Sequence, residues 1–269
     1  MTGGAVTPSV VPVPTPEPDP LFELLLRLGD DRLVLGHRLS EWCGHGPILE
    51  EDIALSNVAL DLLGQATMLL RLAGDVEGRG RDEDALAYFR EVVDFRNCQM
   101  VELRKGDFAF TIARQFLFDV YAVVLLDALA GSCHAELAAI AAKSLKEAKY
   151  HVRHSGEWML KLGDGTAESH GRIQRALDDL WRFTGELFAA DQVDRAMHEA
   201  GIAPDLPALE PTWRSLVRDV LDRATLTLPN DTPRRPGTRG GRSGAHTEFL
   251  GHLLADMQIV ARSHPGATW

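Results

Sequence analysis

The chain has 269 residues, of which 45% are hydrophobic and 25% are charged, as in an ordinary soluble globular protein. Its 28 Lys and Arg residues against 39 Asp and Glu residues give a net charge of −11. Proteins that bind nucleic acid gain most of their affinity from cationic contacts to phosphate, so this acidic balance argues against a nucleic-acid partner.

Three cysteines, Cys43, Cys98 and Cys133, stand far apart and form no CxxC pair, which argues against a disulfide framework or a thiolate zinc site. Residues 1–26 contain no Lys or Arg, so the charged start of a signal peptide is missing. The longest apolar run, Val120–Leu126, is shorter than the roughly 20 residues that cross a membrane. We therefore expect a cytoplasmic protein without a membrane partner.

The first twenty residues hold six of the fourteen prolines. Alternating prolines favour extended backbone and remove hydrogen-bond donors, which predicts a disordered tail over residues 1–20. No PxxP core with a flanking basic residue supports an SH3-type ligand there. Residues 21–269 are then expected to form a single helical domain.

Four long stretches repeat apolar residues at helical spacing. The first pair covers Leu21–Cys43 and Ile48–Ala73, with the Gly46-Pro47 break between them. The second pair covers Asp107–Ala130 and Cys133–Leu162, and Asp107 is a suitable N-cap for its first helix.

A shorter helix over Asp82–Met100 is expected in the crossover between the two pairs. Further helices are predicted near the C-terminus, over Ser169–Ala189, Gln192–Ala200, Pro211–Thr225 and His246–Ser263, with Pro211 in a first helical turn. Pro229–Gly244 is rich in Pro, Gly and Arg and is expected to be a loop. Tight turns within pairs and a long crossover between them indicate an all-α fold, a ferritin-like four-helix bundle with additional C-terminal helices.

Such bundles often hold a di-iron centre, whose usual ligands include a Glu-x-x-His pair on each of two helices. The chain has seventeen Glu residues, and none is followed three positions later by His. At the corresponding places stand Asp61 with Gly64 and Glu147 with Tyr150, while His151 comes one residue too late. Asp119 lies at the same level on the third helix, and Asp30 or Asp31 is nearest on the first. The expected imidazoles are therefore missing.

The remaining polar residues allow two interpretations. Helical spacing aligns Asn57, Asp61 and Gln65 in one row, Gln115 with Asp119 in another, and Lys143, Glu147 and His151 in a third. The favoured interpretation is a hydrogen-bonded network in which Lys143 and His151 neutralise Glu147 and Asp61. The alternative is a mononuclear metal site built from Asp61, Asp119, Glu147 and His151.

Other chemistry has weaker support. No GxGxxG, GxxxxGK[ST], HExxH or GxSxG string occurs. A catalytic pair of Cys43 and His45 is less favoured than a packed Trp42 beside a Gly-Pro turn. The Arg234–Arg242 loop could bind a phosphate or an acidic partner, or could simply be solvated.

Several strings resemble the C-subunit family of phenylacetyl-CoA 1,2-epoxidases, the ring oxygenases of phenylacetate catabolism. They are Leu28-Gly29-Asp30, Glu41–Pro47, Asp61–Ala66, Thr111–Gln115, Lys146–His151, Leu180–Thr184, and His246–Glu248 leading to Ala255–Gln258. The resemblance extends over about Leu21–Trp269 and leaves only the tail outside it.

This resemblance implies a ferritin-like structural subunit that pairs with a homologous catalytic subunit. The partner is expected to hold the di-iron centre and the acyl-CoA site, and a reductase subunit is expected to deliver electrons from NADPH. For this chain we accordingly expect no catalytic residue, no metal ligand and no cofactor-binding residue. The alternative function is an independent metal-binding oxidase that uses a degenerate carboxylate site.

Overall fold

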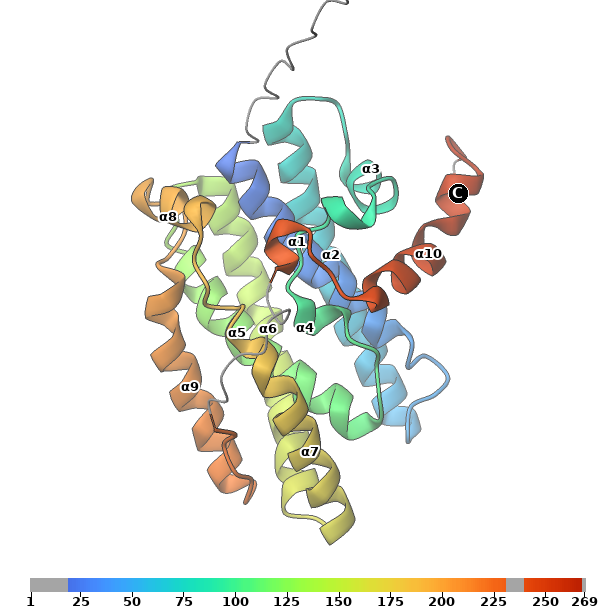
Figure 1. Cartoon of the computed structure of the whole chain (residues 1–269), viewed down its shortest axis with the longest axis vertical. Coiled ribbons are helices and arrows are strands. Elements are labelled where there is room, and N and C mark those ends of the chain that lie inside the picture. Colours follow the sequence, from blue (N-terminus) through green and yellow to red (C-terminus); the bar gives the residue numbers. More distant parts are fainter. Residues whose placement is uncertain (1–18, 231–239, 268–269) are drawn as a thin grey trace, which may run out of the picture.

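The computed structural model describes residues 19–230 and 240–267, and all regular structure within these ranges is helical. The four bundle helices are α1 (Pro20–Ser40), α2 (Leu49–Glu77), α5 (Phe108–Leu129) and α6 (Ala135–Gly163). Helices α1 and α2 pack as one pair and α5 and α6 as the other (Figure 1). The predicted all-α fold with two helix pairs is confirmed. The predicted tail lies, up to residue 18, outside the described residues.

The ends of the bundle helices follow from local chemistry. Pro20 is the first residue of α1, and the Asp19 carboxylate accepts a hydrogen bond from the Leu21 N–H at 2.8 Å. Helix α2 ends at Glu77 and is capped by Gly78, whose φ of 67° is in the left-handed region that favours glycine. Asp107 caps α5 as predicted, because its Oδ1 accepts a hydrogen bond from the Phe110 N–H at 2.8 Å.

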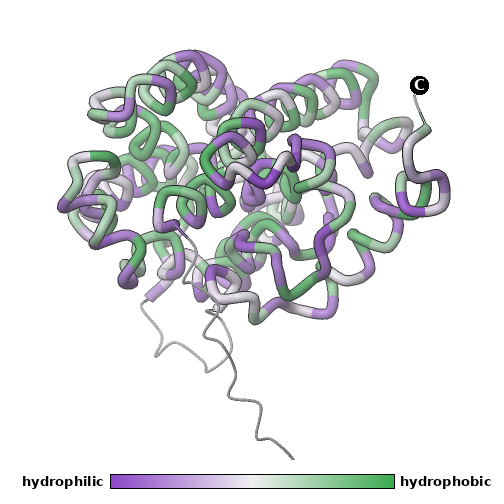
Figure 2. The backbone as a smooth tube through the Cα atoms, turned by 90° about the horizontal axis from the view of Figure 1, so that it is seen from above, coloured by the Kyte–Doolittle hydropathy of each residue, from purple (hydrophilic) through white to green (hydrophobic). Residues whose placement is uncertain are grey.

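Smaller elements cover the bundle. The crossover contains α3 (Glu83–Tyr88), a 3-10 turn η1 (Val92–Asp94) and α4 (Gln99–Glu102). The C-terminal part contains α7 (Ala167–Thr184), α8 (Gln192–Glu199), α9 (Leu206–Arg223), a 3-10 turn η2 (Gly241–Ser243) and α10 (Glu248–Ser263). Apolar residues recur along the helices throughout the molecule (Figure 2). Helix α10 projects to one side with the C-terminus (Figure 1).

The single crossover helix predicted over Asp82–Met100 is wrong. The chain leaves the helical conformation after α3, and its backbone N–H groups instead reach carboxylates on other elements. Arg96 N–H donates to Asp30 Oδ2 and Cys98 N–H donates to Asp31 Oδ1, both at 2.8 Å. These tertiary hydrogen bonds replace the helical ones, so the local pattern alone could not predict the extended backbone.

Two C-terminal boundaries also differ from the prediction. Pro211 was expected in a first turn, but α9 begins at Leu206 and Pro207 occupies that place, which leaves Pro211 inside the helix. Helix α7 begins at Ala167 because Thr166 and Ser169 form a reciprocal cap, and it ends at Thr184 rather than continuing to Ala189.

Two helices, α2 and α5, are long and apolar enough to cross a membrane by length and composition alone. The apolar window of α5 is 83% buried inside the bundle, as in the core helix of a soluble protein. The corresponding window of α2 is only 44% buried. Counting uninterrupted apolar runs in the sequence did not reveal this difference.

Candidate functional site

The polar row predicted between the second and fourth bundle helices forms at the contact of α2 with α6. His151 Nε2 lies 3.0 Å from Asp61 Oδ2, and Gln65 donates to Glu147 Oε2 at 2.8 Å. The Gln65 carbonyl accepts a hydrogen bond from the buried Arg32 guanidinium at 3.0 Å. The row is therefore a chain of paired groups that links α1, α2 and α6.

Two members of the predicted row lie elsewhere. Lys143 does not neutralise Glu147, because its Nζ lies 3.7 Å from Met68 Sδ on an exposed surface. Asn57 is exposed. Glu147 is half-buried and accepts a hydrogen bond from the Gln65 amide, so the predicted pairing of Lys143 with Glu147 does not form.

Asp119 on α5 is the most deeply buried carboxylate near this row, with 1% of its surface exposed. It accepts hydrogen bonds from Gln115 Nε2 at 2.6 Å and from Ser155 Oγ at 2.8 Å. Burial raises the pKa of Asp119 to about 6, although His151 and the two hydrogen bonds act to lower it. This arrangement holds a carboxylate in the core without a cation bound directly to it.

The donor set does not fit a di-iron centre. Gly64 and Tyr150 occupy the places where imidazoles would be needed, and Tyr150 is 47% exposed. Asp61, Asp119 and Glu147 are each engaged with protein partners in separate pairs. Among residues 19–230 and 240–267, no three His, Cys, Asp or Glu side chains gather in a way that could hold a metal ion.

The reversed spacing, His-x-x-Glu, does occur once in the chain, at His154 and Glu157. His154 Nε2 lies 2.9 Å from Glu51 Oε2 on α2, whereas Glu157 is exposed. The two side chains of this motif therefore lie in different environments and do not act together. His154 adds a further link between α2 and α6.

The adjacent carboxylates Asp30 and Asp31 on α1 have a role that the sequence did not indicate. Asp30 forms a two-pronged ion pair with Arg90, and Asp31 pairs with Arg242, with 2.7 Å between Asp31 Oδ2 and Arg242 Nη2. Burial acts to lower the pKa of Arg242, but the Asp31 carboxylate, together with Cys98 and Tyr121, outweighs it and raises that pKa well above its ordinary value. Asp31 thus joins α1 to both the crossover and the segment before α10.

Two further buried carboxylates hold the same segments. Glu102 on α4 accepts hydrogen bonds from the Thr247 N–H and hydroxyl and lies 3.0 Å from His246 Nδ1. Glu186 accepts N–H groups from Gln99, Gly240 and Gly241, and burial raises its pKa. The only sequence signal for this cluster is the pair Asp30 and Asp31 inside the apolar first helix. The sequence pattern relates these two residues to the position of a metal site and not to the crossover.

The other sequence candidates do not converge on a reactive centre. His45 Nδ1 lies 3.1 Å from the Cys43 carbonyl oxygen, so this contact engages the backbone and not the thiol. Trp42 packs edge-on against Phe108 and donates to Thr111 Oγ1 at 3.0 Å, as the favoured packing interpretation predicts. Within the arginine-rich loop, Arg242 pairs with Asp31, and residues 231–239 lie outside the described residues.

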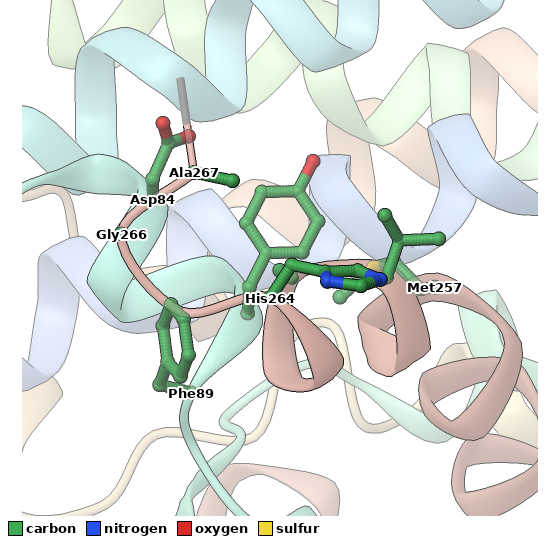
Figure 3. Close-up of a pocket in the computed structure, with 9 residues that line it drawn as sticks. Asp84, Phe89, Met257, His264, Gly266 and Ala267 are labelled. Carbon is green, nitrogen blue, oxygen red and sulfur yellow. The ribbon is translucent and has the colours of Figure 1, made fainter. Parts of the chain in front are cut away.

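A pocket of about 430 Å³ lies between α3 and α10 (Figure 3). Phe89 and Met257 contribute apolar surface, and Asp84 lies beside Ala267, apart from the His264 imidazole. Burial, together with Asp82 and Glu83, raises the pKa of Asp84. Phe89 and His264 are both exposed, so the pocket is an open surface depression with a single carboxylate rather than an enclosed acid–base site.

Comparison with known proteins agrees with this geometry. Residues 11–269 match the model of a family described as phenylacetic acid catabolic protein. The chain is 48% identical over 244 residues to the C subunit of the 1,2-phenylacetyl-CoA epoxidase of Escherichia coli (strain K12), and the matched region covers 91% of this chain and 97% of that protein. The chain therefore belongs to the phenylacetic acid catabolic protein family.

Proposed function

We propose that this chain is the non-catalytic, structural subunit of a multicomponent 1,2-phenylacetyl-CoA epoxidase in the cytoplasm. In this role it supports a homologous di-iron catalytic subunit, which epoxidises the ring of phenylacetyl-CoA with O2 and with electrons from NADPH delivered by a reductase subunit. The chain itself would contribute no catalytic residue and no cofactor.

One observation carries the proposal. The bundle has the arrangement of a di-iron protein, yet Gly64 and Tyr150 stand where imidazole ligands would be needed, and the nearby carboxylates are bound by Gln65, Gln115, Ser155 and His151. Groups held by protein partners in this way stabilise the bundle and leave no open coordination position. The similarity to the C subunit of an epoxidase supports the same assignment.

The test is reconstitution with the catalytic subunit and the reductase. We expect iron to accompany the catalytic subunit, and we expect turnover of phenylacetyl-CoA only when this chain is present. Asp61→Ala should leave the iron content of the assembled complex unchanged, as should Glu157→Ala, the matched exposed control on α6.

Two results would contradict the proposal. One is full epoxidation by the catalytic subunit and reductase without this chain. The other is stoichiometric iron or manganese on the isolated chain that is lost in Asp61→Ala and kept in Glu157→Ala, which would instead support an independent metal-binding oxidase.

A further inference from the structure

The bundle is covered unevenly. Elements α4, α8 and α10 pack against α1, and α7 and α9 pack against α5 and α6. The crossover helix α3 packs against α2 near its C-terminal end, where Arg71 pairs with Glu83. The outward surface of α2 from Leu49 to Thr67, together with the adjoining surface of α6, remains uncovered in the described structure.

Helix α2 is unusually apolar for a helix that leaves so much of its surface exposed. Its most apolar window is nearly as hydrophobic as that of the central helix α5, yet 44% of it is buried against 83% for α5. Leu49, Ile53 and Leu60 are 71%, 53% and 65% exposed, and Gly64 and Thr67 continue the same stripe. Spacings of three, four and seven residues place all five on one side of the helix.

Helix α6 carries a basic stripe beside this apolar one. Lys143, Lys146, Tyr150 and Arg153 follow one another at spacings of three and four residues and are all exposed. The contact of Lys143 Nζ with Met68 places the stripe next to α2, and the Arg153 guanidinium lies 5.2 Å from the centre of the Tyr150 ring. Within the described residues none of these three cations forms an ion pair, although the chain has a net charge of −11.

We propose that this surface, the α2–α6 face (Leu49, Ile53, Leu60, Lys143, Lys146, Tyr150 and Arg153), binds an amphipathic helix of the catalytic subunit. The inference rests on the proposed function for the identity of the partner. A helix fits because ridges at three- and four-residue spacing pack into the groove between two antiparallel helices. Gly64 has no neighbour within 4 Å of the position of an added Cβ, so the partner helix can approach α2 closely there.

The basic stripe on α6 determines which side chains the partner helix must carry. The apolar side must cover Leu49, Ile53 and Leu60, and carboxylates along its edge would pair with Lys146 and Arg153. The half-buried Asp61–His151 and Gln65–Glu147 pairs lie along the seam between α2 and α6. Docking would shield both pairs from water, so the network would gain strength when the complex forms.

The test measures the affinity of the full-length chain for the purified catalytic subunit. Leu60→Glu should weaken binding at least tenfold, because it places a charge in the middle of the apolar stripe. Ile259→Glu is the matched control, since Ile259 is similarly exposed, at 61%, but lies on α10. Lys146→Glu combined with Arg153→Glu should weaken binding and remove most of its salt dependence. The matched control is Arg175→Glu combined with Arg182→Glu, which reverses two exposed charges on α7, away from the α2–α6 face, and should leave binding unchanged.

The outcomes separate the two proposals. If the wild-type chain does not bind the catalytic subunit at all, the proposed function fails, and this inference fails with it. If the wild-type chain binds but Leu60→Glu has no effect, or Ile259→Glu abolishes binding, only the surface is wrong. Self-association of the isolated chain that Leu60→Glu disrupts would assign the face to a second copy and overturn the inference. Slower hydrogen exchange in residues 53–67 of the wild-type complex provides a readout that needs no variant.

Discussion

Asp119 is a residue whose charge weakens the fold at neutral pH. Burial raises its pKa to about 6, against an ordinary value of 3.8, so the folded protein holds this proton more tightly than the unfolded chain does. The contribution of Asp119 to stability therefore falls as the pH rises through about 4 to 6 and is constant above that window. At pH 7 the cost is on the order of 3 kcal/mol.

Asp119→Asn should remove this cost. An asparagine can still accept from Gln115 and can donate to Ser155, whose hydroxyl would then donate to the His151 carbonyl. We expect the free energy of unfolding in urea to rise by up to about 3 kcal/mol at pH 7.5, and by much less at pH 5. Asp256→Asn, an exposed carboxylate on α10, should change little at either pH. A variant less stable than wild type at pH 7.5 would mean that the charged form is favoured by Ser155 and His151 more than it is penalised by burial.

Other residues of the candidate site show what sequence spacing can and cannot predict. Helical periodicity correctly paired Gln115 with Asp119 and His151 with Asp61, because residues four apart share a face and long antiparallel helices align their rows. It failed for Lys143, because a small error in rotational phase moves a long side chain from the seam to the surface. Spacing also could not reveal the unequal exposure of α2 and α5, which depends on where later elements pack.

At the scale of elements, the bundle helices were predictable and the crossover was not. Capping residues and apolar periodicity are local signals, and they fixed α1, α2, α5 and α6 to within a few residues. The crossover adopts its extended backbone because Asp30, Asp31 and Glu186 accept its N–H groups, and these partners lie between 66 and 87 residues away in sequence. No local pattern contains that information.

Asp31→Asn tests whether these carboxylates fasten the crossover and the C-terminal segment to the bundle. The change leaves the partly buried Arg242 facing a neutral group, and breaking a largely buried pair in this way costs up to about 3–5 kcal/mol. Because Asp31 binds residues 98 and 242 directly, we expect faster hydrogen exchange in residues 96–102 and 240–247, with the pairing of α5 and α6 preserved.

The control for this experiment is Asp84→Asn, which changes an exposed carboxylate on the crossover that has no ion-pair partner in the described structure. Equal acceleration of exchange in all four bundle helices would contradict the prediction, because it would mean that Asp31 stabilises the whole fold and not these two segments in particular.

For the whole molecule, the uneven cover of the bundle predicts that stability depends on the partner. A ligand that binds only the folded state stabilises it by RT ln(1 + [L]/Kd), which is about 2.7 kcal/mol at a hundredfold excess over Kd. We expect the unfolding midpoint of this chain to rise steadily with the concentration of the catalytic subunit. A tenfold higher Kd would leave about 1.4 kcal/mol at the same concentration, so Leu60→Glu should reduce the rise by about half or more. It should have little effect on the isolated chain, because Leu60 is 65% exposed there.

Asp119→Asn provides the complementary case in the same titration. Asp119 is 1% exposed and lies in the bundle core, so its replacement should shift the starting midpoint without changing the partner-dependent rise. The two effects should then add, one acting inside the bundle and the other on its surface. A partner-dependent rise that is lost in Asp119→Asn and kept in Leu60→Glu would contradict this expectation. It would mean that partner binding depends on the packing inside the bundle and that the partner does not bind the α2–α6 face.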